Sequence, residues 1–234
     1  MKKTKFVLGI LMTLLSLAAI GQGQENKIDI LNERERAQVR DEILKERFNE
    51  LLPELMDRTG MDMWLIISRE YNEDPVMRTM LPAKWLNARR RTIIAFYRDK
   101  ERDTIEKLAV ARYDIGENIA SAWNKEEEPE QWKALERIIA SRNPSRIGIN
   151  HSEHFGLADG LVLTDYNELK QALPDSLDQR LVSAEKLSIA WIETRTKREM
   201  ELFEDLVQIT HDIIDEAFSS DVIKPGETTT DDVV

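Results

Sequence analysis

The feature that most constrains the fold of this chain is a run of large apolar residues at positions 63–67, which reads Met-Trp-Leu-Ile-Ile. A strand with one face in water alternates apolar and polar residues, whereas an unbroken apolar run is typical of a strand buried on both faces. Helices packed on both sides of a sheet provide such burial. The run therefore predicts a central strand in an α/β domain.

Helical patterns lie on both sides of this strand in the sequence. Residues 32–58 carry apolar side chains at spacings of three and four with charges between them. Pro53 is expected to kink or restart this helix, and Gly60 to end it. Residues 130–141 and 166–173 show two further amphipathic helices that could cover the sheet.

Four further segments have the composition of strands. Residues 92–97 and 105–111 flank a charged turn and predict a hairpin, while residues 146–150 and 180–183 indicate two short strands. Because strands and helices alternate along the chain, we expect an α/β fold with a mixed β-sheet flanked by helices.

The first residues have the pattern of an export signal. Lys2, Lys3 and Lys5 precede an apolar run at residues 6–20, and small residues follow where cleavage would occur. The run is shorter than the ~20 apolar residues that span a bilayer, so cleavage is favoured over a membrane anchor. We expect residues 1–23 to be a signal peptide and the mature protein to be exported, either periplasmic or secreted.

The charge balance of the chain limits its partners. Its formal net charge is −11, with 44 acidic and 33 basic residues. Nucleic acids and anionic membranes attract basic surfaces, so we expect no nucleic acid as a partner and no membrane association after signal cleavage. The chain has no cysteine, which suits an exported protein that folds without disulfides.

The character of the sequence changes near residue 191. A capping-box pattern at residues 196–199 begins a helix with one apolar stripe, and a Pro-Gly breaker and a new helix start follow. We expect residues 24–190 to form the α/β domain. Residues 191–234 are expected to hold a linker and the truncated beginning of a second, α+β domain. Because the stripe lacks its main partner, this helix is expected to be poorly anchored.

One loop is the main candidate for a ligand site. Arg69, Glu70, Tyr71 and Asp74 follow the predicted central strand, and in open α/β sheets ligands lie beyond the strand ends. Carboxylates in this position suit acid–base chemistry. A structural interpretation is equally good, because Asp74 followed by Pro75 is typical of the N-cap and first residue of a helix. Both interpretations stay open.

Three other polar clusters are weaker candidates. His151, Glu153 and His154 have side chains that bind Zn²⁺, but no Cys or further His is available to complete the shell, so a polar turn is favoured. The acid–His–acid row that includes His211 is expected to be a solvated helix face. The arginines at residues 89–91 are interpreted as a surface charge run.

Four stretches, taken together, resemble an exported bacterial member of the M24 metallopeptidases, the creatinase/Xaa-Pro aminopeptidase or pita-bread family. They are residues 60–67 with 69–76, residues 146–150 with Ser152, residues 193–200, and residues 223–228. Each stretch is short, but together they span nearly the whole mature chain in a consistent order and spacing.

The resemblance implies a creatinase-like N-terminal domain followed by the first helix of a catalytic domain. In that family two divalent metal ions (Mn, Co or Zn), held by two Asp, one His and two Glu, activate a water that hydrolyses Xaa-Pro bonds. None of these ligands maps onto this sequence. We therefore assign this chain no catalytic residue, no metal ligand and no bound cofactor, and expect it to be inactive alone.

The resemblance also implies partners. A peptide substrate would bind through the missing catalytic domain, the full-length protein would be a homodimer, and the loop with Arg69, Glu70, Tyr71 and Asp74 would contribute to the substrate cleft. The leading hypothesis is thus the N-terminal portion of an Xaa-Pro aminopeptidase or dipeptidase. The alternatives are a non-catalytic exported module for binding or dimerisation derived from that family, and an α/β domain whose resemblance reflects ancestry only.

Overall fold

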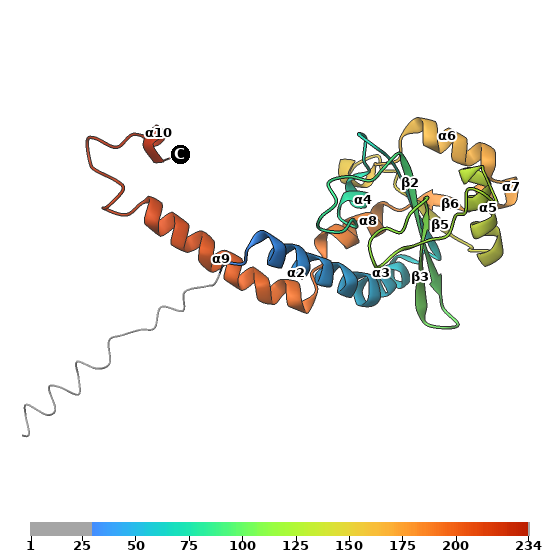
Figure 1. Cartoon of the computed structure of the whole chain (residues 1–234), viewed down its shortest axis with the longest axis horizontal. Helices are drawn as coiled ribbons and strands as arrows, with labels where there is room; N and C mark the ends of the chain where they lie inside the picture. Colours follow the sequence, from blue (N-terminus) through green and yellow to red (C-terminus); the bar gives the residue numbers. More distant parts are fainter. Residues whose placement is uncertain (1–29, 234) are drawn as a thin grey trace, which may run out of the picture. The chain divides into compact units, whose positions relative to one another are not determined.

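The computed structural model describes residues 30–233 (Figure 1). The chain divides into two units, and each is described by itself. The first, Leu31–Leu206, contains the sheet, and the second includes residues 207–233. The expected signal peptide at residues 1–23 lies outside the described residues.

Six strands form one mixed sheet in the order β4-β3-β2-β1-β5-β6. β1 pairs antiparallel with β2, and β2 and β3 form the predicted hairpin. The β1–β5, β5–β6 and β3–β4 pairs are parallel. The strands are β1 (Met63–Arg69), β2 (Arg91–Asp99), β3 (Thr104–Val110), β4 (Ala120–Ser121), β5 (Ile147–Ile149) and β6 (Leu181–Ser183). The predicted α/β class with a mixed sheet flanked by helices is confirmed.

β1 is buried on both faces, as its apolar run predicted. Trp64 and Ile66 belong to one hydrophobic cluster, and Met63, Leu65 and Ile67 belong to a second one. Successive side chains of a strand point to opposite faces of the sheet, so β1 contributes to both clusters.

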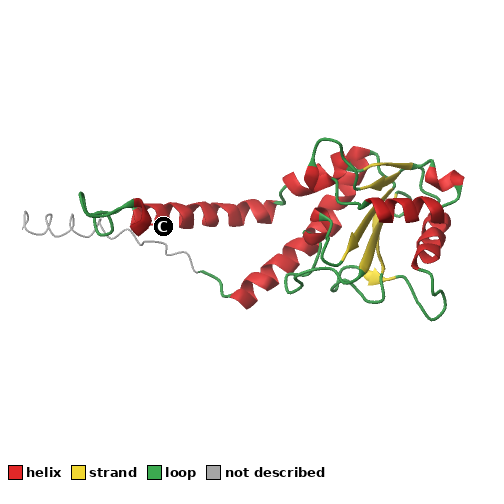
Figure 2. Cartoon of the chain, turned by 90° about the horizontal axis from the view of Figure 1, so that it is seen from above, coloured by secondary structure: helices red, strands yellow, loops and turns green. Residues whose placement is uncertain are grey.

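Helices cover both faces of the sheet (Figure 2). One face packs against α2, η1, α3, α4 and α8. The other face packs against α5, α6 and α7. The helical elements are α2 (Glu33–Glu46), the π-helical turn η1 (Arg47–Leu51), α3 (Leu52–Thr59), α4 (Pro75–Arg78), α5 (Gln131–Arg142), the 3-10 turn η2 (Gly156–Ala158), α6 (Leu163–Ala172), α7 (Asp175–Asp178) and α8 (Glu185–Glu193).

The helix predicted at residues 32–58 is one helical stretch with a π turn in its middle. Within it, the Leu52 N–H reaches five residues back to the Arg47 carbonyl, and Pro53, which has no N–H to donate, lies in the first turn of α3. The helix therefore continues through Pro53 without a break, and the expected kink or restart takes the form of a π turn just before this residue. Gly60 ends α3 with a φ of 68°, a left-handed conformation that glycine adopts readily.

Two α-helices of the sheet unit, α7 and α8, and the short strand β4 have no counterpart among the predicted elements. The longer of the two helices is α8. It buries Leu187, Ala190 and Trp191. The indole N–H of Trp191 donates a 2.8 Å hydrogen bond to the hydroxyl of Thr79. The domain boundary expected at residue 190 therefore falls inside a helix, and the residue after it belongs to the core. The boundary itself stays a prediction.

Four aromatic residues lie at the centre of the larger hydrophobic cluster. The ring of Phe48 lies 5.5 Å from that of Phe96 and 5.6 Å from that of Trp191, between centroids. Trp64 lies 6.0 Å from Phe96 and 6.5 Å from Trp191. Aromatic pairs of this kind contribute about 0.5–1.5 kcal/mol each beyond their buried area. They join η1, the sheet and α8 into one core.

The helix α9 (Lys197–Ala217) begins at the predicted capping box. The Thr196 hydroxyl accepts from the Glu199 N–H at 3.2 Å, and the Thr196 N–H donates to the Glu199 carboxylate at 2.8 Å. All of α9 is described and none of its residues is buried. The short helix α10 (Thr230–Val233) follows. Within residues 30–233, no helix is both long and apolar enough to span a bilayer.

Candidate functional site

Two arginines stand opposite each other where β1 ends and β2 begins. Arg69, the last residue of β1, is in register with Arg91, the first residue of β2. Residues paired across antiparallel strands share a face of the sheet, and like charges in this position repel each other. The pair therefore requires neighbouring carboxylates.

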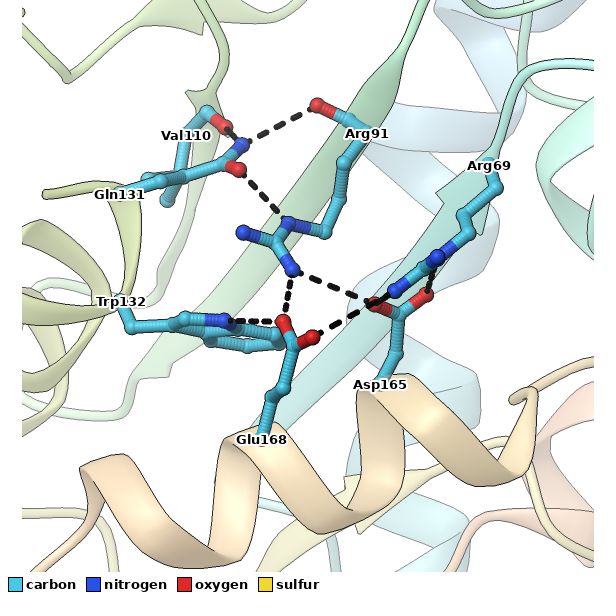
Figure 3. Close-up of polar contacts among 7 residues, drawn as sticks. All are labelled: Arg69, Arg91, Val110, Gln131, Trp132, Asp165 and Glu168. Carbon is cyan, nitrogen blue, oxygen red and sulfur yellow. Dashed lines mark hydrogen bonds and ion pairs between the residues drawn. The ribbon is translucent and has the colours of Figure 1, made fainter.

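Asp165 and Glu168 of α6 supply these carboxylates (Figure 3). The Asp165 side chain is fully buried and accepts hydrogen bonds of 2.8 Å from Nε and Nη2 of Arg69. It also lies 3.3 Å from Nη1 of Arg91. Glu168 bonds to Nη1 of Arg91 and lies 3.7 Å from Nη2 of Arg69. Residues three apart on a helix share a face, so α6 presents both carboxylates to both arginines.

α5 completes this network through Gln131 and Trp132. The Gln131 Oε1 accepts from Nε of Arg91 at 2.8 Å, and its Nε2 donates to the carbonyls of Arg91 at 3.1 Å and Val110 at 2.6 Å. The Trp132 indole donates to Glu168 at 2.8 Å, and the Arg91 guanidinium lies 4.4 Å from the Trp132 ring centroid. The backbone carbonyl and the guanidinium group of Arg91 are thus both held in place.

The electrostatics of the network favour its charged form. Hydrogen bonding to Asp165 raises the pKa of Arg69. The Trp132 indole N–H, and then the Arg91 guanidinium, lower the pKa of Glu168. Glu168 is therefore ionised at neutral pH and is not suited to donate a proton as a general acid. The network positions two arginines rather than transferring protons.

A pocket with a volume of about 680 Å³ adjoins this network, and we call it the arginine pocket. Its lining residues are Arg69, Glu70, Tyr71, Arg89, Arg90, Arg91, Arg112, Tyr113, Trp123 and Gln131. Three of the four candidate residues from the sequence are therefore brought together here. The most exposed of them is Tyr71, which is 87% accessible.

Two lining residues have a left-handed backbone conformation, which residues other than glycine rarely adopt. Tyr71 has a φ of 69° and Arg90 a φ of 53°. Such residues cost on the order of 1–3 kcal/mol each and cluster at ligand sites. Glu70 ties the two turns together, because its N–H donates to the Arg90 carbonyl at 2.6 Å and its carboxylate accepts the Arg90 N–H at 2.8 Å.

The backbone of Arg89 is fixed as well. The Tyr113 hydroxyl donates to the Arg89 carbonyl at 3.0 Å and accepts the Arg89 N–H at 3.1 Å. The interpretation of residues 89–91 as a surface charge run agrees with the exposure of Arg89 and Arg90. It is wrong for Arg91, whose side chain is only 25% exposed and is paired with Asp165 beneath it.

Asp74, the fourth candidate, is not among the pocket's lining residues. Its Oδ1 caps α4 by accepting the N–H groups of Val76 at 2.7 Å and Met77 at 3.1 Å, as the structural interpretation predicted. Its Oδ2 accepts from the amide of Asn150 at 2.8 Å, and Asn150 accepts from the Trp64 indole at 2.8 Å. Burial raises the pKa of Asp74, and these hydrogen bonds oppose the increase.

The histidine cluster after β5 forms a polar turn. The Ser152 hydroxyl accepts two backbone N–H groups of the same turn and bonds to the Glu185 carboxylate. The His151 Nδ1 lies 3.3 Å from the Asp159 carboxylate. In the described part of the chain, no three His, Cys, Asp or Glu side chains are placed to hold a metal ion.

The sequence reasoning missed the residues that hold the arginines. Asp165 lies one residue before the helix predicted at 166–173. The only local signal is the i, i+3 spacing of Asp165 and Glu168, which also fits a solvated helix face. Arg112 and Trp123 come from loops without a recognisable motif, and only the fold brings them to the pocket.

No protein-family model matches the chain, and no curated protein matches it. Among solved structures, an Xaa-Pro dipeptidase from Bacillus anthracis is similar over 84% of this chain and 46% of that chain, with 15% sequence identity and a TM-score of 0.45. This chain therefore spans just under half the length of that protein. The activity of the whole protein enters below only as a proposal.

Proposed function

We propose that this chain is the N-terminal portion of an exported metallopeptidase of the M24 type, an aminopeptidase or dipeptidase that hydrolyses Xaa-Pro peptide bonds. The catalytic residues would lie in a part of the polypeptide outside these residues. The whole protein would be a homodimer that acts on peptides.

The observation that carries this proposal is the position of the stretches that resemble the family. Residues 60–76 contain β1 and residues 146–152 contain β5, and these two strands pair in parallel inside the sheet. Asn150, beyond the end of β5, accepts from Trp64 and donates to Asp74. Two stretches far apart in the sequence thus belong to one buried polar network. Motifs that resembled the family only by chance would have no reason to come together in the fold.

The family's pair of divalent metal ions does not fit the residues that the structure describes. Within residues 30–233 no group of three or more potential ligands is gathered. No step of the reaction is therefore assigned to these residues. Under the proposal, this chain supplies the fold and a loop, and Arg69, Glu70 and Tyr71 at the carboxyl end of β1 contribute to the substrate cleft.

The alternative function is a non-catalytic exported module for binding or dimerisation. The arginine pocket favours it, because five of its ten lining residues are arginines and it is built entirely from this chain. A binding module needs such a pocket but no metal ligands.

The test is to extend the reading frame beyond Val234 and to express the encoded protein. The proposal expects two Asp, one His and two Glu in a following catalytic domain, and cleavage of an Xaa-Pro peptide that depends on Mn²⁺, Co²⁺ or Zn²⁺. N-terminal sequencing of the exported protein checks cleavage near residue 23.

The 234-residue chain, assayed under the same conditions, is the matched control and should show no turnover. Metal-dependent cleavage by this chain alone would show that the chemistry is not located elsewhere. A stop codon directly after Val234 would contradict the proposal and support the binding module.

A further inference from the structure

The arginine pocket concentrates positive charge in an acidic protein. Five arginines line it, and Glu70 is the one carboxylate among its lining residues, whereas the whole chain has a formal net charge of −11. Five guanidinium groups around one pocket repel one another at short range, and hydration alone does not compensate for this repulsion.

The five arginines fall into two groups. Arg69 and Arg91 are neutralised by Asp165 and Glu168 beneath the pocket. The side chains of the other three, Arg89, Arg90 and Arg112, make no hydrogen bond or ion pair with any described residue. The carboxylate of Glu70 is engaged by the backbone N–H of Arg90. The pocket therefore retains unneutralised positive charge.

The backbone that carries these arginines is held in place. Hydrogen bonds from Glu70 fix the strained turn at Arg90, and the Tyr113 hydroxyl fixes Arg89 on both sides of its backbone. Strained, well-supported backbone of this kind is found at ligand sites, where binding then has to order only the side chains and not the backbone that carries them.

The chemistry of the lining defines the ligand class. Guanidinium groups bind carboxylates and phosphates through paired hydrogen bonds. Tyr71, Tyr113 and Trp123 add aromatic surface beside them, and pockets for small molecules have volumes of about 300–1,000 Å³. We propose that the arginine pocket binds a small molecule that carries two or more oxyanion groups, either carboxylates or phosphates. This site does not depend on the proposed peptidase relationship.

The test is isothermal titration calorimetry on the whole chain with pyrophosphate and, separately, with tricarballylate. The variant is Arg89→Gln combined with Arg112→Gln, because neither side chain makes a hydrogen bond or ion pair with a described residue and the fold should be unaffected. Arg90 is left intact because of its strained φ. We expect the double variant to bind about tenfold more weakly or worse, since it removes two guanidinium groups that would make charge-assisted hydrogen bonds to the ligand.

The matched control is Arg58→Gln, which removes an exposed arginine of α3 that does not line the pocket. It should change affinity by less than about twofold, as expected for a distant surface charge. Binding of pyrophosphate alone would identify phosphate compounds as the ligands, and binding of tricarballylate alone would identify carboxylates. Binding of neither ion, or an equal loss in Arg58→Gln, would overturn the proposal.

Discussion

Arg69 ends β1 and Asp74 lies five residues after it, but the two residues have different roles. A tight turn separates them, in which the Asn72 N–H donates to the Arg69 carbonyl at 3.0 Å. Arg69 lines the arginine pocket, whereas Asp74 is fully buried and bonds to the start of α4 and to Asn150. The sequence shows that both residues lie in one loop, but not that the chain turns one of them inward.

Replacing Asp74 by alanine should destabilise the domain. The change removes the N-cap of α4, worth about 0.5–2 kcal/mol, and leaves the buried amide of Asn150 without its acceptor, which costs about 1–3 kcal/mol. Relief of the buried charge offsets part of this loss. We expect the free energy of unfolding, measured by urea denaturation, to fall by about 2–4 kcal/mol.

Asn72→Ala is the control for this experiment, because Asn72 is exposed and lies in the same loop. It should change the free energy of unfolding by no more than about 0.5 kcal/mol. If Asp74→Ala were equally harmless, the structural role of Asp74 would be wrong, and its place in a substrate cleft would need to be considered again.

The candidate site shows the limit of local patterns. The position of Arg69 at a strand end was visible because an apolar run marks β1. The partner Asp165 lies 96 residues further along the chain, and a single sequence does not record such a pairing. Packing decides the direction of each side chain, and therefore which residues line the pocket and which are buried. The periodicity of a sequence does not describe this packing.

Among the elements, those with a clear period were predicted, whereas α8 and the short elements α7 and β4 were missed. α5 and α6 carry apolar residues at spacings of three and four, and the predicted helices agree with them within a few residues. α8 carries a short, nearly continuous apolar run, residues 189–192, and packs against the largest cluster. Such a run does not distinguish a buried helix from a strand, because neither leaves a polar face.

The beginning of α9 is anchored through Arg47 of η1. The guanidinium donates to the Thr194 carbonyl at 2.9 Å and to the Glu199 carboxylate at 2.8 Å, and it lies 4.4 Å from the Trp191 ring centroid. Glu199 therefore serves both the capping box and this ion pair. No comparable burial occurs along α9, all of which is described.

We expect amide exchange to vary along α9. The amides of Glu199 and Met200, which donate to the hydroxyl and the carbonyl of Thr196, should exchange slowly in the whole chain. The amides beyond Phe203 should exchange much faster than those of β1, because no residue of the helix is buried. Glu199→Ala should accelerate exchange at the start of the helix by about tenfold or more, since it removes the glutamate half of the capping box and the ion pair of Arg47. Hydrogen exchange with mass spectrometry measures both effects.

Glu204→Ala, on the exposed surface of the same helix, is the matched variant and should leave the first turn unchanged. Slow exchange beyond Phe203, equal to that of β1, would contradict the expected weak anchoring of this helix. An unchanged first turn in Glu199→Ala would show that Arg47 does not hold it.

The whole molecule depends on one sheet with two hydrophobic clusters. Every buried residue of both clusters lies between Leu44 and Trp191, inside the unit Leu31–Leu206. Hydrophobic burial is the main favourable contribution to stability, so this unit should account for nearly all of it. The arginine pocket is built from the same unit and should persist wherever that unit folds.

Two shortened chains separate the contribution of residues 191–206, which begin with Trp191, from that of residues 207–234. A chain of residues 31–206 keeps both clusters, and its Tm should lie within about 2 °C of that of the longer chain. A chain of residues 31–190 loses Trp191. Loss of a buried tryptophan costs about 3–5 kcal/mol, which corresponds to a fall in Tm of roughly 6–20 °C for a domain of this size. Calorimetry of both chains measures the difference. Equal Tm values would place Trp191 outside the core and support a domain boundary at residue 190, whereas the expected difference would extend the α/β domain through α8.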